Sequence, residues 1–160
     1  MKKIGELVIY RLDVCEIVEI IKFNNLDYYV LIPLSDKSLK LNVPVDNKLG
    51  LLRDLISKEK VEEIINNIPN IKILENNEKL LENEYKKLIN TNNHEDLIKI
   101  IKTTYLRNLG RINNHKKIGD KDNYYFQKAE NYLYSEFSVV LNVSYDETKK
   151  YVIDKVSELV

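Results

Sequence analysis

Residues 23–33 have the sequence Phe23-Asn-Asn-Leu-Asp-Tyr-Tyr-Val-Leu-Ile-Pro33, which predicts a tight turn followed by a β-strand. Asparagine and aspartate tolerate left-handed backbone angles, so Phe23–Asp27 suits the turn. The aromatic and β-branched residues of Tyr28–Ile32 suit a pleated surface. The preceding stretch predicts a second strand, with Val14, Glu16, Val18 and Ile20 on one face and Cys15, Ile17, Glu19 and Ile21 on the other.

Two further strands are predicted outside this hairpin. Leu7–Tyr10 is a short apolar run, and Leu39–Val43 alternates apolar and polar residues until Pro44 ends the ladder. The three apolar residues of Leu39–Val43 are expected to face the core of the module. About four or five short strands within some fifty residues predict a small β-barrel or a strongly bent sheet.

After Gly50 the apolar pattern changes to a helical period. The first helix is expected to begin at the capping residue Ser57 and to end before Pro69, with apolar residues three and four apart between them. Four more helices are predicted, at Asn77–Ile89, Glu95–Leu109, Asp122–Leu141 and Tyr145–Leu159. The expected architecture is therefore β + α, with an N-terminal sheet module followed by an all-α C-terminal domain.

Capping residues and apolar faces support these helices. Asn93 is a predicted N-cap, and Ser144 with Glu147 forms a capping box. One largely apolar face consists of Leu97, Ile100, Ile101, Thr104 and Tyr105. Tyr105 and Tyr132 continue apolar faces and are expected in the core. Gly110–Asp120 is predicted to be a basic loop.

Charge is balanced overall but not locally. The chain has 25 basic and 25 acidic residues, yet residues 98–128 carry eight lysines and arginines against only Asp120 and Asp122. Such a basic segment in a neutral protein is the pattern expected of a local phosphate contact. The alternative is a solvated face whose charge is balanced by the acidic helices on either side.

Catalytic and metal-binding patterns are weak, and we expect neither an enzyme nor a metal or cofactor site. Cys15 lies among apolar strand residues and is expected to be a small buried side chain. A catalytic role for it is the third hypothesis, after two non-enzymatic ones. His94 is expected near a helix cap and His115 in an exposed loop. No apolar run approaches the roughly 20 residues of a membrane span, and no basic-then-apolar leader is present, so we expect a cytoplasmic protein.

Several segments, in the right order, resemble the CarD/CdnL family of bacterial RNA polymerase-binding transcription regulators. They are Asp27-Tyr-Tyr-Val-Leu-Ile-Pro-Leu34, Leu41-Asn-Val-Pro-Val-Asp-Asn47, Leu51-Leu-Arg-Asp-Leu-Ile56, Glu95-Asp-Leu-Ile-Lys-Ile-Ile-Lys-Thr-Thr-Tyr-Leu-Arg107 and Phe126-Gln-Lys-Ala-Glu-Asn-Tyr-Leu-Tyr-Ser-Glu-Phe137. The last two are similar to the long C-terminal helices of Firmicutes members. The resemblance covers roughly residues 3–155.

The resemblance implies a Tudor-like domain at 1–55 that binds a lobe of the RNA polymerase β subunit, a helix and linker at 56–74, and a helical domain at 75–160 that contacts promoter DNA. The implied polymerase-binding residues are Lys40, Leu41, Asn42, Val43 and Pro44. The basic residues proposed to contact the DNA backbone are Lys86, Lys87, Lys99, Lys102, Arg107, Arg111, Lys116 and Lys117.

Two departures from the family pattern affect this expectation. Many relatives have a cation where Asn42 stands here. The family also inserts a tryptophan at the edge of the melted DNA, whereas this chain has none, and the corresponding position falls within Ile73–Asn77. The alternative function is a protein-interaction module of the same fold that binds polymerase or another partner without contacting DNA.

Overall fold

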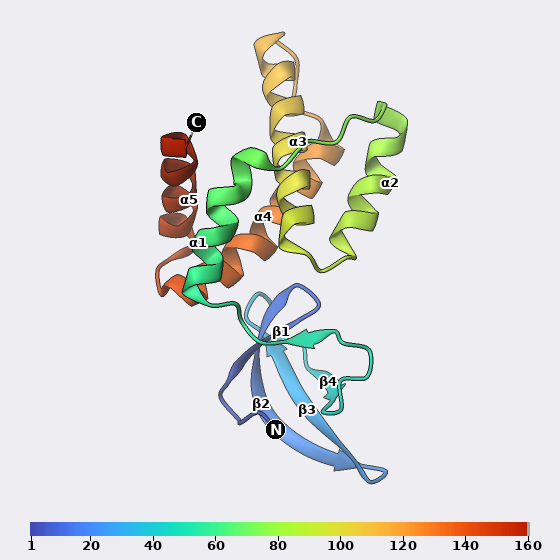
Figure 1. Ribbon diagram of the computed structural model, residues 1–160. Coiled ribbons are helices and arrows are strands. Elements are labelled where there is room, and N and C mark those ends of the chain that lie inside the picture. Colours follow the sequence, from blue (N-terminus) through green and yellow to red (C-terminus); the bar gives the residue numbers. More distant parts are fainter. Residues whose placement is uncertain (160) are drawn as a thin grey trace. The chain divides into compact units, whose positions relative to one another are not determined.

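The computed structural model describes residues 1–159 and contains two compact units, Met1–Ile56 and Ser57 onward (Figure 1). The first unit is a β-sheet and the second consists of helices. The predicted β + α order is therefore confirmed.

The N-terminal unit is an open antiparallel sheet of five strands in the order β4-β3-β2-β1-β5. The strands are β1 (Leu7–Tyr10), β2 (Asp13–Phe23), β3 (Leu26–Pro33), β4 (Leu41–Pro44) and β5 (Leu52–Arg53). β4 and β5 lie at opposite edges of the sheet, so among the described residues it does not close into a barrel.

The predicted turn at Phe23–Asp27 is confirmed as a two-residue hairpin. Phe23 pairs with Leu26, and the two residues between them, Asn24 and Asn25, have φ values of 50° and 63°. Positive φ at both central positions matches the right-handed twist of the flanking strands. The asparagines therefore set the register between β2 and β3.

The predicted alternation of β2 is correct only up to a bulge. The register with β3 shifts between Ile17 and Glu19, which adds one residue to β2. Ile20 consequently packs toward the same cluster as Cys15 and Ile17, although the sequence placed it on the opposite face. Cys15 is completely buried, as predicted.

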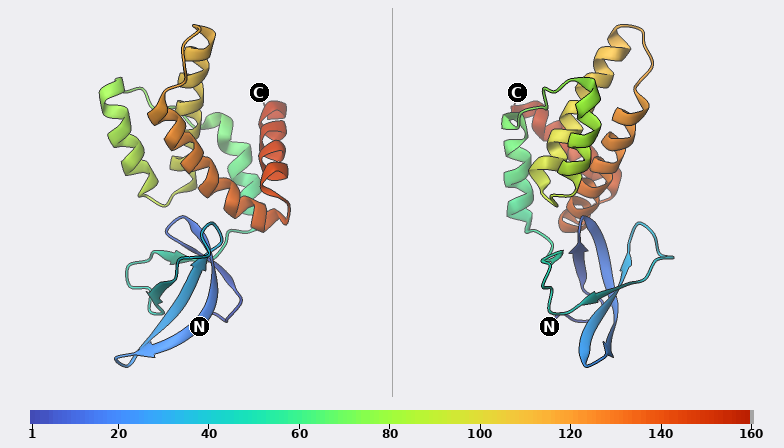
Figure 2. Two further views of the ribbon diagram at one scale, coloured as in Figure 1. Left: turned by 180° about the vertical axis from the view of Figure 1, so that it is seen from behind. Right: turned by 90° about the vertical axis from the view of Figure 1, so that its right-hand side faces the viewer.

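The second unit contains α1 (Lys58–Asn67), the 3₁₀ turn η1 (Ile68–Asn70), α2 (Glu78–Ile89), α3 (His94–Asn113), α4 (Asp120–Leu141) and α5 (Tyr145–Leu159). α4 packs against the other four helices, and Figure 2 shows this arrangement from two further sides. The predicted caps Ser57 and Asn93 are confirmed, since each accepts a hydrogen bond from the first turn of the helix that follows, and Asn77 caps α2 in the same way. Ser144 does the same for Glu147.

Two expectations for α3 are wrong. The helix continues through Asn113, so Gly110 and Arg111 are helical and the following loop spans only residues 114–119. Tyr105 is exposed rather than in the core, because the buried face of α3 runs through Leu97, Ile100 and Thr104. Tyr132 on α4 is half-buried.

Candidate functional site

The edge strand β4 contains most of the residues expected to bind polymerase. β4 is hydrogen-bonded to β3 on one side and forms one edge of the sheet. Such an edge carries main-chain groups that can pair with a strand from another protein.

The register identifies which main-chain groups of β4 point outward. Val45 N–H donates to the Asp27 carbonyl at 3.0 Å, in line with the pairing of Val43 with Tyr29. Hydrogen-bonded pairs alternate along an antiparallel ladder, so Val43 bonds to β3 while Asn42 turns its main-chain N–H and carbonyl toward the open edge. The Pro44 carbonyl accepts a hydrogen bond from Asn47 N–H at 3.2 Å. Pro44 has no N–H, and its position on the open side costs the ladder no hydrogen bond.

Side chains of β4 divide between the core and solvent. Val43 is buried and Leu41 is half-buried, whereas Asn42, Pro44 and the preceding Lys40 are exposed. The expectation that Leu39 also faces the core is wrong. The turn before β4 extends to that residue, since Leu39 N–H donates to the Asp36 carbonyl at 3.2 Å, and Leu39 is exposed.

Of the eight cations proposed to contact DNA, three lysines are held by nearby groups. Lys86 pairs with Glu82 at 3.5 Å and Lys99 with Asp96 at 3.6 Å, each within one helix. Lys102 Nζ donates to the carbonyls of Ile68 and Ile71 at 2.9 and 2.5 Å. Burial lowers the pKa of Lys102.

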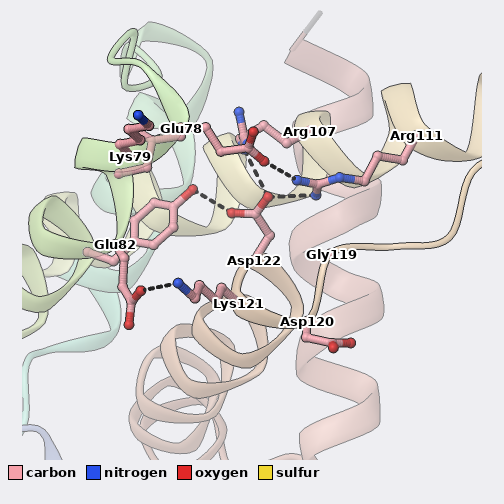
Figure 3. A pocket seen from close by; sticks show the side chains of 11 residues that line it. Glu78, Lys79, Glu82, Arg107, Arg111, Gly119, Asp120, Lys121 and Asp122 are labelled. Atoms are coloured by element: carbon pink, nitrogen blue, oxygen red, sulfur yellow. Dashed lines mark hydrogen bonds and ion pairs between the residues drawn. The ribbon is translucent and has the colours of Figure 1, made fainter.

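Arg107 and Arg111 are held by a buried carboxylate from α4. Oδ2 of Asp122 accepts hydrogen bonds from Arg107 Nε at 2.8 Å and from Arg111 at 2.6 Å (Figure 3). Oδ1 of the same carboxylate accepts a hydrogen bond from the Tyr85 hydroxyl at 2.9 Å. Both arginines also reach the exposed carboxylate of Glu78 on α2.

The titration behaviour of this cluster follows from its contacts. Burial alone would raise the pKa of Asp122, but the hydrogen bonds from Arg111, Arg107 and Tyr85 outweigh it and hold the pKa below its usual value. Burial, together with the Asp122 carboxylate, raises the pKa of the Tyr85 hydroxyl. At neutral pH the cluster therefore consists of two guanidinium groups, one carboxylate and one neutral phenol.

A shallow cavity of about 440 Å³ lies beside this cluster, lined by α2, α3 and the first turn of α4. Its lining includes four cations and four carboxylates: Lys79, Arg107, Arg111 and Lys121, and Glu78, Glu82, Asp120 and Asp122 (Figure 3). The charges balance, so the cavity has no excess positive charge with which to bind an anion. Gly119 borders it closely: a Cβ there would lie 2.6 Å from the Arg111 guanidinium.

The three remaining cations of the proposed DNA-binding set are Lys87, Lys116 and Lys117. All three are exposed, and no described residue forms an ion pair with them. Lys116 and Lys117 lie next to each other in the α3–α4 loop, after His115, whose φ is 58°. The predicted exposed position of His115 is confirmed.

The sequence analysis did not predict that Arg107 and Arg111 point inward, although their spacing along α3 indicates it. Leu97, Ile100, Thr104, Arg107 and Arg111 are three or four residues apart and form one helix face. Extending the predicted apolar face by the same spacing places both arginines toward α4. His94, expected only near a cap, also bridges to α4, where its Nε2 lies 2.8 Å from Oε1 of the buried Glu136.

Other candidate sites are not accessible or not assembled. Burial raises the pKa of the Cys15 thiol to about 12, so the thiol stays protonated at neutral pH. No group of metal-ligating side chains is assembled within residues 1–159, and no helix there has the length and apolar character needed to cross a membrane. In the segment expected to replace the family tryptophan, Ile73 is exposed, and Leu74 N–H is bonded to Thr103 Oγ1 at 2.9 Å.

Comparison with known proteins adds no relative. No protein-family model matches the chain, and no curated protein matches it.

Proposed function

We propose that the protein is a non-enzymatic transcription regulator that binds the β subunit of bacterial RNA polymerase through the open edge of β4. In this proposal the N-terminal unit has the Tudor-like role of the family it resembles, and the regulator acts in the cytoplasm. The helical unit touches the promoter DNA backbone and modulates the stability of the open complex.

The position of β4 at a sheet edge is the observation that carries the proposal. A partner strand that added to β4 would pair with the outward main-chain N–H and carbonyl of Asn42. Lys40 and Asn42 provide exposed side chains beside that line of hydrogen bonds. Because main-chain pairing tolerates side-chain change, the neutral Asn42 is compatible with docking.

The DNA contact is proposed for Lys87, Lys116 and Lys117. These exposed lysines have no ion pair with a described residue, so a phosphate can replace water at each ammonium group without breaking an internal contact. Arg107, Arg111 and Lys102 would each have to give up a half-buried hydrogen bond first.

The ion pairs and hydrogen bonds that these cations form within the protein favour a second candidate function. Five of the eight cations proposed for DNA are already paired or hydrogen-bonded within the protein. With no tryptophan to insert at the DNA edge, the chain also suits a module that binds polymerase or another protein without touching DNA.

The polymerase contact is tested by measuring binding of the isolated β-subunit lobe to the wild-type protein and to two edge variants. Lys40→Glu with Asn42→Asp places negative charge along the edge, and Asn42→Pro removes the outward N–H while leaving the bonds to β3. We expect both to weaken binding at least tenfold. Lys22→Glu, which makes the same change as Lys40→Glu but on the interior strand β2, is the matched control and should bind as the wild type does. Absence of wild-type binding would reject the proposal.

Open-complex lifetime separates the two candidate functions. Lys116→Gln with Lys117→Gln should shorten the lifetime of a promoter complex, increasingly so at low salt, if the protein touches DNA. Lys150→Gln on α5 is the control, since it removes an exposed cation elsewhere. An unchanged lifetime, with polymerase binding intact, would select the function without DNA contact.

A further inference from the structure

The C-terminal half of α3 has its polar and apolar faces reversed. The face that buries Leu97, Ile100 and Thr104 continues into Arg107 and Arg111, whose charged groups bind Asp122. The opposite side of the same turns carries Tyr105, Leu109 and Ile112. A surface helix normally does the opposite, with apolar residues inward and charges outward.

These apolar side chains are open to solvent. Tyr105 is 55% exposed, Leu106 46%, Leu109 37% and Ile112 56%. α3 has no buried residue after Thr104. Figures 1 and 2 show these C-terminal turns extending beyond the neighbouring helices. We refer to Tyr105, Leu106, Leu109 and Ile112 as the α3 stripe.

The α3 stripe has the spacing used in helix-mediated recognition. Tyr105, Leu109 and Ile112 stand at positions i, i+4 and i+7, and Leu106 widens the same face. Contiguous exposed apolar surface of this kind marks interaction sites in soluble proteins. The Asp122 cluster fixes the rotation of α3, because turning the stripe inward would remove both guanidinium groups from their carboxylate.

Charge around the stripe restricts what can cover it. Residues 97–119 contain six cations and no acidic residue. Four of these cations are held internally, whereas Lys116 and Lys117 lie exposed just beyond the end of the stripe. A complementary surface must therefore be apolar along its centre and acidic at the end that meets these lysines.

We propose that the α3 stripe binds an amphipathic helix of another protein, one whose apolar residues are flanked by aspartate or glutamate. The partner's apolar residues cover Tyr105, Leu109 and Ile112, and its carboxylates pair with Lys116 and Lys117. The stripe spans only about two helical turns, so the contact is weak and reversible. This inference does not depend on polymerase binding by β4. It agrees with the second candidate function, because a partner's carboxylates and DNA phosphates compete for Lys116 and Lys117.

A second copy of the chain is a poorer occupant. Two stripes packed together would bring no carboxylate to Lys116 or Lys117, since residues 97–119 of either copy contain none. Nucleic acid is also a poorer occupant, because phosphates satisfy the lysines but leave the leucine, isoleucine and tyrosine side chains without apolar partners.

Fluorescence anisotropy with a designed peptide tests this inference on the full chain. The probe is a labelled helical peptide with leucine along one face and glutamate on both flanks, and its control has lysine in place of every glutamate. We expect the acidic peptide to bind at least tenfold more tightly than the lysine peptide. Leu109→Ser with Ile112→Ser should weaken binding at least tenfold, and Lys116→Glu with Lys117→Glu should remove the preference for glutamate.

Leu80→Ser with Ile153→Ser is the matched control, since it removes two similarly exposed apolar residues from α2 and α5. It should bind the acidic peptide as the wild type does, and circular dichroism should report the same helix content for all variants. Equal binding of the two peptides, or no effect of the stripe variant, would overturn the inference. The inference would also be overturned if the acidic peptide did not bind and the stripe made another contact instead. That contact would be a dimer, or binding to phosphatidylglycerol vesicles, that Leu109→Ser with Ile112→Ser abolishes.

Discussion

The edge strand β4 and the C-terminal turns of α3 leave opposite kinds of groups open to solvent. At β4 the apolar Val43 is buried, and the outward groups are the main-chain N–H and carbonyl of Asn42. In α3 the charged groups of Arg107 and Arg111 turn inward, and apolar side chains are exposed. The two surfaces therefore suit different partners, an added strand in one case and an apolar helix in the other.

This difference shows how far a local charge count can mislead. The basic excess of residues 98–128 suggests a phosphate-binding surface, but much of it is neutralised by carboxylates on other elements. Ion pairing between elements depends on the tertiary fold. By contrast, β4 could be identified as a strand from its own alternation and its terminal proline.

The largest effect we expect distinguishes the two halves of α3. Leu97→Ala should lower the free energy of unfolding by about 3 kcal/mol, because Leu97 is fully buried and its truncation leaves a cavity. Leu109→Ala, the same change on the α3 stripe, should stay within about 0.5 kcal/mol. Urea unfolding of both variants measures the difference. Similar losses would mean that the stripe is covered within the protein.

A smaller loss is expected when the Asp122 cluster is broken. Asp122→Ala leaves two arginines and the Tyr85 hydroxyl without their carboxylate, and we expect the free energy of unfolding to fall by about 2–3 kcal/mol. Glu78→Ala removes an exposed carboxylate from the same arginines and should cost less than about 1 kcal/mol. Thermal unfolding compares the two. Equal losses of unfolding free energy in the two variants would show that the Asp122 carboxylate does not hold α3 in place.

The smallest effects concern pH, and two carboxylates of α4 should respond in opposite directions. The pKa of Asp122 is lowered in the folded state, so its contribution to stability is present above the unfolded value of about 3.9 and is lost as the pH falls through the folded pKa. The stability difference between wild type and Asp122→Asn should therefore shrink from pH 7 to pH 3.

Glu130 provides the contrast because burial, only partly offset by Lys149, raises its pKa. Ionising Glu130 costs folding free energy as the pH rises above the unfolded value of about 4.3. We expect Glu130→Gln to be neutral or stabilising by about 1 kcal/mol at pH 7. Urea unfolding of Asp122→Asn and Glu130→Gln at pH 7 and pH 3 checks the two predictions. If Glu130→Gln lowered the free energy of unfolding at pH 7 as much as Asp122→Asn does, the opposite directions assigned to the two pKa shifts would be contradicted.

Local chemistry explains which parts of the fold could be predicted. Asn24 and Asn25 form the expected turn, and Ser57 and Asn93 cap the expected helices, because these signals act over a few residues. The bulge between Ile17 and Glu19 could not be predicted, since it depends on pairing between strands. The β4 edge was expected from the sequence, whereas the Asp122 cluster joins three helices and becomes visible only when they pack.

Amide hydrogen exchange at Asn42, measured by NMR with and without the isolated β-subunit lobe, tests the central claim most directly. In the free protein the Asn42 amide should exchange rapidly while that of Val43 is protected, because Val43 bonds to β3 and Asn42 does not. On addition of the lobe, the Asn42 amide should become protected. An Asn42 amide that still exchanges rapidly in a complex that does form would contradict strand addition at β4.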